Sequence, residues 1–321
     1  MKKVAAVFVS IGVILVIAGL VMVGIFGGEA IKNINWRDVF SGTTHNLESA
    51  NASDDKTAEE LNGLTNIEIN VGRYTVYVLP TDENKVSVKY VSPLEDGVDV
   101  QVTYLDSKLM VTETDNLGSL FFGGLFGSKR FIAVYVPQTE LFTSATLTVN
   151  AVTAGIKIQD VTFASVKCIA ETGGINLFNN NVKDVEISAN TGAVNIKQLN
   201  CDNLIARADT GSVNLNEVTA KNSIAVDVNT GSVNCHVTTD KLTVDTDTGS
   251  VNFTVEANDI KIFTDTGSVN GDIKGSKAEY QISVRKDTGK SNIQSQQVAN
   301  ATKFLTVEVD TGSINIDFDN D

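Results

Sequence analysis

One five-residue phrase, Thr-Gly followed most often by Ser-Val-Asn, recurs through the C-terminal half of this 321-residue chain. Its copies begin at Thr172, Thr191, Thr210, Thr230, Thr248, Thr266, Thr288 and Thr311, after a degenerate copy at Thr153. Subtracting successive Thr numbers from Thr172 onward gives spacings of 19, 19, 20, 18, 18, 22 and 23 residues. A period of this size is typical of solenoids, in which each repeat buries its apolar side chains on its neighbours.

Within each repeat, apolar and polar residues alternate, as in the copy that begins at Thr210. Val213 and Leu215 alternate with asparagines, a polar break covers residues 217–222, and a second alternating run covers residues 224–229. Alternation with β-branched enrichment predicts two short strands per repeat, and the Gly of each phrase supplies the backbone angles of a corner. We therefore predict an all-β fold, a single-stranded parallel β-helix or solenoid with about nine rungs of 18–23 residues.

Stacked repeats also align equivalent side chains in columns. The last residue of each phrase is expected to join an amide ladder: Asn176, Asn195, Asn214, Asn234, Asn252, Asn270, Asn292 and Asn315. The residue before each Thr is mostly acidic, which gives a column that includes Asp209, Asp247, Asp265, Asp287 and Asp310. Because Ca²⁺ takes oxygen ligands, this column is a weak candidate calcium site. The preferred interpretation is that these residues form turns, since the calcium-binding nine-residue repeat is absent.

The N-terminus carries a different signal. Residues 4–26 are an unbroken run of apolar and small residues without charge, which predicts one transmembrane α-helix in contact with membrane lipid. A cleaved signal peptide would have a shorter apolar core and a small-x-small site after it, so we favour an uncleaved signal anchor. The positive charges before the apolar run are those of Lys2, Lys3 and the N-terminal amino group, and those after it are Lys32 and Arg37. This balance predicts an N-terminus in the cytoplasm and a C-terminal part outside the cell membrane.

These signals divide the chain into four parts. We expect a cytoplasmic stub and anchor at residues 1–27, a polar stalk at 28–62, an N-terminal capping β region at 63–150, and regular solenoid repeats at 151–321. Within the stalk, a linker and then one short helix are expected. The capping strands are longer and more aromatic than the repeats, as suits the atypical unit that closes a solenoid. The carboxylates at the C-terminus are expected to protect the last strand edge.

Composition argues against several kinds of chemistry. The net charge of −14 repels nucleic acid, whose phosphates need Lys and Arg partners. The two histidines, His45 and His236, lie far apart in the sequence, and zinc sites need clusters at short spacing. Cys168, Cys201 and Cys235 are odd in number and are interpreted as buried thiols. We predict no catalytic, cofactor or metal site beyond the weak calcium column, and therefore no enzyme.

One irregular segment, residues 117–127, combines glycines with large apolar side chains. Leu120, Phe121, Phe122, Leu125 and Phe126 could form an exposed contact loop for a partner or a membrane. The favoured alternative is that the phenylalanines fold back and plug the open end of the solenoid.

The anchor, the Val-Tyr-Val-Leu-Pro strand at 76–80, the strand that ends at Val136-Pro137 and the Thr-Gly-Ser-Val-Asn phrases together resemble the bacterial "putative adhesin" β-helical domain family. The resemblance covers about residues 64–321. It implies a surface-exposed, non-catalytic β-solenoid behind a membrane segment, in a family whose function is unknown and for which no active-site residues are defined.

Three functions follow as hypotheses. The first is an adhesin-like binding or scaffolding module that contacts an envelope glycan or a surface protein. The second is an envelope-stress sensor that depends on its membrane helix. The third, least favoured, is a carbohydrate-active β-helix enzyme, which would need one specific pair of carboxylates in a groove.

Overall fold

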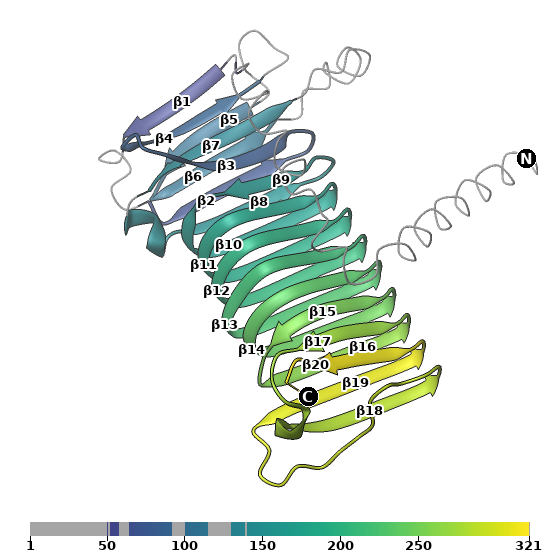
Figure 1. Cartoon of the computed structure of the whole chain (residues 1–321). Coiled ribbons are helices and arrows are strands. Elements are labelled where there is room, and N and C mark those ends of the chain that lie inside the picture. Colours follow the sequence, from purple (N-terminus) through teal and green to yellow (C-terminus); the bar gives the residue numbers. More distant parts are fainter. Residues whose placement is uncertain are drawn as a thin grey trace, which may run out of the picture.

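The computed structural model describes residues 50, 52–57, 64–91, 100–114, 130–138 and 140–320. In this part of the chain the fold is an all-β parallel solenoid, and the helical content is limited to the 3₁₀ turns η1 (Glu140–Ser144) and η2 (Lys277–Glu279) (Figure 1). No helix among the described residues is long and apolar enough to cross a membrane. The predicted anchor at residues 4–26 lies outside them.

The centre of the solenoid is built from long strands that each cover two sides of a rung. These strands are β10 (Thr162–Thr172), β11 (Ile175–Thr191), β12 (Val194–Thr210), β13 (Val213–Thr230) and β14 (Val233–Thr248). They pair in parallel and in repeat register, so that Val194 lies beside Val213 and Thr210 beside Thr230. The predicted parallel β-helix is therefore confirmed.

The bend within β11, β12 and β13 is tighter than the polar break that we predicted from the sequence. A single residue with a left-handed backbone forms the bend: Asn179 (φ 51°), Gln198 (φ 56°) or Glu217 (φ 56°). Each of them is skipped in the strand pairing, although the residues on both sides of it are paired. Left-handed φ is uncommon for non-glycine residues, although asparagine tolerates it better than most. The rung of β14 omits this residue, which shortens it relative to β13.

The core consists of aliphatic columns that run along the solenoid. The first inward side chain after each glycine corner is fully buried, as in Val194, Val213, Val233 and Val251. Burial of one such side chain contributes roughly 1.5–3 kcal/mol, and every rung adds several of them. Because the side chains of one rung contact only the rungs above and below it, each added rung contributes its own increment of stability.

The glycine corners set the close approach of the rungs. Gly192, Gly211 and Gly231 have φ of 147°, 148° and 150°. A Cβ built on Gly231 would lie 2.1 Å from the carbonyl oxygen of Gly211 and 2.6 Å from its carbonyl carbon. Any side chain would thus meet backbone that cannot move without disturbing the next rung.

At the N-terminal end the order of rungs in space departs from the order in sequence. The strands involved are β2 (Asn66–Val71), β3 (Thr75–Thr81), β6 (Lys108–Glu113), β7 (Phe131–Pro137), β8 (Thr146–Ala151) and β9 (Ile156–Gln159). β2 lies between β6 and β8, and β3 between β7 and β9, all in parallel. The later pair β6–β7 therefore forms the outer rung.

Antiparallel strands complete this end. β5 (Val100–Leu105) pairs with β6, β4 (Lys85–Tyr90) pairs with β7, and β1 (Ala52–Thr57) pairs with β4. The expectation of a linker at residues 51–55 is thus wrong, because the backbone of residues 52–57 adds a strand to the sheet. Most of the short helix expected at residues 56–61 lies outside the described residues. The side chain of Glu113 closes the corner of the β2–β3 rung by accepting hydrogen bonds from the backbone N–H groups of Gly72 (2.6 Å) and Arg73 (2.8 Å).

The C-terminal end is also out of sequence order. The strands here are β15 (Val251–Glu256), β16 (Asp259–Thr266), β17 (Val269–Ile273), β18 (Tyr280–Thr288), β19 (Lys303–Thr311) and β20 (Ile314–Phe318). β19 pairs with β16 on one side and with β18 on the other, and β20 pairs with β17. The last rung in the sequence is thus inserted inside the one that precedes it (Figure 1). Our expectation that the C-terminal carboxylates lie at the last edge is therefore wrong for the side that holds β19, which β18 covers, whereas β20 is the last named strand on the other side.

The deviating phrase at Thr288 explains this exchange. It places Ser291 where the other copies have the buried Val or Ile, so it cannot supply an inward aliphatic residue to an internal rung. Its Asn292 side chain instead ends the sheet: Nδ2 donates to the Ile316 carbonyl (3.1 Å), and Oδ1 accepts from the Ile316 N–H (2.9 Å). Ile293, just beyond it, is buried against the end of the core.

The glycine corners generate a stability prediction. Gly231→Ala is expected to cost roughly 2–6 kcal/mol, because it combines left-handed strain with a clash against backbone. The matched control is Gly275→Ala, since Gly275 also has a left-handed φ (125°) but a Cβ there would meet only side-chain atoms, at 3.5 Å or more. Urea unfolding of both variants tests this, and equal losses would show that the rung contact is unimportant.

The end cap generates a second prediction. Asn292→Ala should lower the free energy of unfolding by roughly 1–3 kcal/mol, because it leaves the Ile316 backbone groups without partners. It should also increase light scattering on storage, since an open strand edge promotes association. Asn315→Ala, on the neighbouring exposed position of β20, is the control and should change neither property.

Candidate functional site

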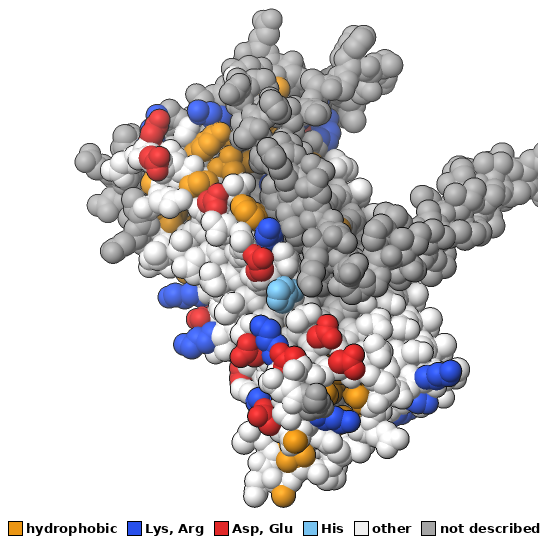
Figure 2. Space-filling model, in the orientation of Figure 1, with side chains coloured by type: hydrophobic (Ala, Val, Ile, Leu, Met, Phe, Trp, Pro, Cys, Tyr) orange, Lys and Arg blue, Asp and Glu red, His pale blue; other side chains and the backbone are white. Residues whose placement is uncertain are grey.

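The outward positions of the solenoid form two faces with different chemistry. One face carries the strands that follow the glycine corners, and the other carries the strands that precede them. We call the first the amide face and the second the charged face. Figure 2 looks onto the side that bears the histidine of the amide face, and most of the solenoid in this view is neither charged nor apolar.

The amide face is organised by an asparagine ladder. Each Nδ2 donates to the Oδ1 of the preceding rung, at 2.9 Å from Asn195 to Asn176, 2.8 Å from Asn214 to Asn195 and 2.8 Å from Asn234 to Asn214. Two further rungs continue it, with Asn252 donating to Asn234 at 3.0 Å and Asn270 donating to Asn252 at 3.1 Å. The predicted ladder is thus confirmed over these rungs.

The ladder ends before the positions that the sequence alone would have included. Asn315 continues the column in register after Asn270, but its side chain is exposed and makes no hydrogen bond within the described part of the chain. Asn292 serves the end cap instead. The ladder side chains are half-buried from Asn176 to Asn234, and each keeps one N–H and one oxygen lone pair beyond its ladder bonds.

Two more polar columns follow the ladder in the direction of the strands. The next outward position along the strands holds Lys197, Asn216, His236 and Thr254 in successive rungs. Beyond the bend, a column on the short edge of the solenoid is uncharged in consecutive rungs: Thr162, Asn181, Asn200, Thr219 and Thr238. The amide face therefore presents mainly amides and hydroxyls at a repeat of about 4.8 Å, together with Lys197 and His236.

The charged face contains ion pairs at its N-terminal half and carboxylates further on. Glu186 bridges Lys167 (3.0 Å) and Arg207 (3.1 Å), and these cations hold the pKa of its carboxyl below the usual range. Further along, burial and the neighbouring Asp227, Asp247 and Asp265 raise the pKa of Asp245.

The predicted acidic column lies on this face, and its members are exposed: Asp209, Asp247, Asp265, Asp287 and Asp310. Because the last two rungs are exchanged, Asp310 follows Asp265 and Asp287 comes last. No group of three or more His, Cys, Asp or Glu residues is arranged to hold a metal ion anywhere in the described ranges. Each of these carboxylates lies one residue before the C-terminal threonine of its strand, in β12, β14, β16, β18 and β19. Calcium binding by this column stays a prediction.

The cysteines lie inside the solenoid as unpaired thiols. Cys168 and Cys235 are fully buried and Cys201 nearly so, as predicted. Burial raises the pKa of Cys235 to about 12 and, with Asp202 and Asp184, that of Cys201 to about 12. These thiols are therefore inert packing groups.

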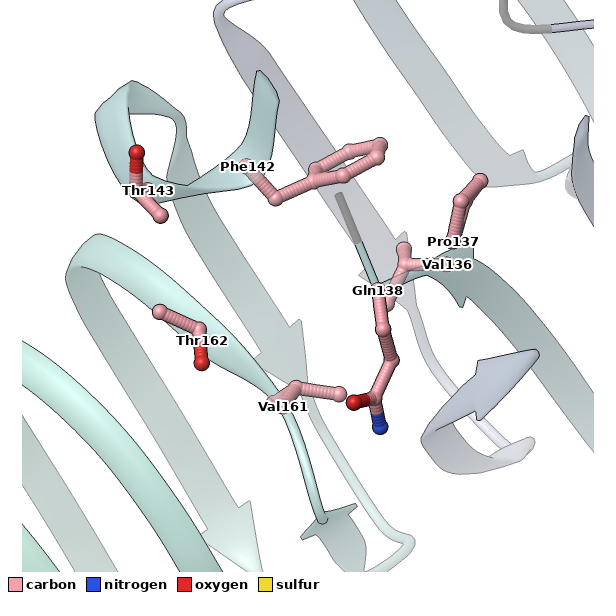
Figure 3. Close-up of a pocket in the computed structure, with 7 residues that line it drawn as sticks. All are labelled: Val136, Pro137, Gln138, Phe142, Thr143, Val161 and Thr162. Atoms are coloured by element: carbon pink, nitrogen blue, oxygen red, sulfur yellow. The ribbon is translucent and has the colours of Figure 1, made fainter. Parts of the chain in front are cut away.

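A small pocket of about 190 Å³ opens at the start of the short edge (Figure 3). Val136, Pro137, Phe142 and Val161 form its apolar walls, and Gln138, Thr143 and Thr162 add polar groups. The Phe142 ring is fixed by an edge contact with Phe163 at a centroid distance of 5.9 Å. Sequence reasoning missed this pocket, because its residues come from β7, η1 and the β9–β10 bend and share no motif.

The predicted contact loop, Leu120, Phe121, Phe122, Leu125 and Phe126, lies outside the described residues, as does His45. The other histidine, His236, is exposed on the amide face.

Comparisons with known proteins place the fold in a family. A family model described as Toastrack DUF4097 matches residues 64–317. A comparison with curated protein sequences gives no significant match. Among solved structures, a "putative adhesin" from Bacteroides fragilis NCTC 9343 is 11% identical with a TM-score of 0.49, over 68% of this chain and 96% of that chain. A "putative cell adhesion protein" from Clostridium sporogenes ATCC 15579 is 10% identical with a TM-score of 0.24, over 83% and 99%.

The crowding of carboxylates on the charged face generates a pH prediction. Asp245 binds its proton more tightly in the folded chain than in the unfolded one, so its ionisation lowers stability as the pH rises above the ordinary Asp value of about 3.9. Asp245→Asn should therefore raise the melting temperature at pH 7, most strongly at low salt, and give no gain at pH 3. Asp106→Asn, in the left-handed β5–β6 turn, is the control. A gain for Asp245→Asn that persists at pH 3 would contradict the electrostatic cause.

Proposed function

Because this chain belongs to the Toastrack DUF4097 family and folds as a rigid solenoid, we propose that it is a non-catalytic, adhesin-like module of the cell envelope. Its ligand is an extended, uncharged glycan that lies along the amide face. A membrane helix at residues 4–26 holds the module at the cell surface, with the solenoid outside.

The asparagine ladder is the observation that carries the proposal. Its amides are fixed by their neighbours at 2.8–3.1 Å between Asn214 and Asn270, so they lose little conformational freedom when a ligand binds. Each amide still offers a donor and an acceptor. Their repeat of about 4.8 Å, set by strand pairing, is close to the length of one β-linked sugar unit. A polysaccharide could therefore make equivalent contacts on successive rungs.

Charge narrows the class of ligand. The net charge of −14 opposes polyanions, and the charges of the solenoid's central rungs are concentrated on the other face, around Glu186 and Asp245. Neutral hydroxyl and amide groups are the chemistry that the ladder and the column from Asn181 to Thr238 can satisfy. Each contact is weak, and binding strength comes from their number along one polymer.

The proposal predicts that loss of ladder amides weakens glycan binding. The variant Asn214→Ala, Asn234→Ala, Asn252→Ala in the full-length chain should lose at least about tenfold in affinity, since each lost hydrogen bond contributes roughly 0.5–1.5 kcal/mol. Binding is measured by co-sedimentation with peptidoglycan, chitin and cellulose, and the length of soluble oligosaccharides is followed as a check for turnover.

The matched control is a triple variant on outward positions of the charged face: Thr148→Ala, Thr243→Ala and Thr306→Ala. It should bind like the parent chain, and circular dichroism checks that both triples remain folded. Absence of sedimentation with all three polymers, or an equal loss in the control, would refute the assignment. Shortened oligosaccharides would point to an enzyme instead.

A further inference from the structure

We propose that the pocket of Figure 3 binds the acetamido group of an N-acetylated sugar, so that the glycan held by the amide face is one that carries such groups. This inference rests on the proposed glycan function and names the class of glycan. The pocket lies where the short edge of the solenoid begins, in the same column as Asn181 and Asn200. A polymer lying on the amide face can therefore reach it.

The size of the pocket fits one substituent. A volume of about 190 Å³ holds an acetamido group together with part of a sugar ring, and it is too small for a disaccharide. Val136 and Phe142 are almost fully buried and Val161 is 4% exposed, so the walls are part of the packed core and keep their shape without ligand. Binding to a preformed cavity of this kind costs little free energy for ordering the side chains that line it.

The lining matches the two halves of an acetamido group. The apolar walls of Val136, Phe142 and Val161 suit its methyl group. In Figure 3 the Gln138 side chain reaches across the mouth toward Val161. The Gln138 Nε2 donates to the Asp160 carbonyl at 3.0 Å, which leaves Oε1 to accept the acetamido N–H.

The bend at Asp160 holds Gln138 in position. Asp160 has a left-handed φ of 54°, and its carboxylate accepts hydrogen bonds from Gln159 Nε2 (2.7 Å) and Asn179 Nδ2 (2.5 Å). This bend is thereby held rigid, and the carbonyl that orients Gln138 is held with it. Thr162, on the exposed start of β10, also lines the pocket, and its hydroxyl is a donor for the acetamido carbonyl once the side chain turns toward the ligand.

The test compares two neutral β-1,4-linked hexasaccharides that differ in the substituent: N-acetylated chitohexaose and cellohexaose. The full-length chain should bind chitohexaose about tenfold more tightly by isothermal titration calorimetry. Saturation-transfer NMR should show the strongest transfer to the acetyl methyl protons. Thr162→Phe, which places a ring in the pocket, should reduce chitohexaose affinity to the level of cellohexaose and abolish the methyl signal.

Thr219→Phe is the matched control, because Thr219 occupies the same exposed column three rungs away. Because Thr219 belongs to the glycan-binding face, this variant should lower the affinity for both hexasaccharides alike and leave their ratio intact. Both variants should have the melting temperature of the parent chain. Gln138→Ala gives a second variant that removes the acceptor without filling the pocket. Equal binding of both sugars would overturn the acetamido assignment and leave the glycan function standing. Binding of neither sugar would refute the glycan function, and the pocket assignment with it.

Discussion

The close stacking of one glycine corner on the next is the constraint on which the rest of the structure depends. At these corners the backbone of one rung lies so near its neighbour that a Cβ on Gly249 would sit 1.7 Å from the carbonyl oxygen of Gly231. This contact fixes the register of the rungs whose corners run from Gly173 to Gly289. Register in turn brings identical inward residues into aliphatic columns and identical outward residues into polar ones. The core and the asparagine ladder are thus two results of the same backbone contact.

Function in such a fold is expected on the outward columns, because the inward ones are fully committed to packing. The two faces differ in their polar residues. Amides and hydroxyls predominate on one face, and the ion pairs and crowded carboxylates of the central rungs lie on the other. The carboxylates reduce stability at neutral pH, as the raised pKa of Asp245 indicates. The amides stabilise the ladder and still have hydrogen-bonding capacity to spare. This division is the reason to look for a neutral ligand.

The two ends of the solenoid are closed in different ways. At the N-terminal end the antiparallel strands β1, β4 and β5 add to the sheet, and the Glu113 carboxylate closes the corner of the β2–β3 rung. At the C-terminal end the Asn292 side chain pairs with the backbone of β20. Rungs are also exchanged at each end. The pocket lined by Phe142 and Gln138 exists because the chain crosses there through η1 instead of a single-residue bend. The irregular ends therefore create concave surface that the regular rungs do not have.

The sequence by itself determined the repeat, the strand alternation, the amide ladder through Asn270 and the burial of the cysteines, because each follows from a local pattern copied at a fixed period. The resemblance to a β-helical family was confirmed by the match over residues 64–317. Only the tertiary structure decided the order of the terminal rungs, the strand at 52–57 and the pocket, since these depend on contacts between segments far apart in the chain. The sequence did contain a signal for the order of the C-terminal rungs. Ser291 interrupts the inward aliphatic column and so marks a rung that belongs at the end, where its neighbour Asn292 can terminate the sheet.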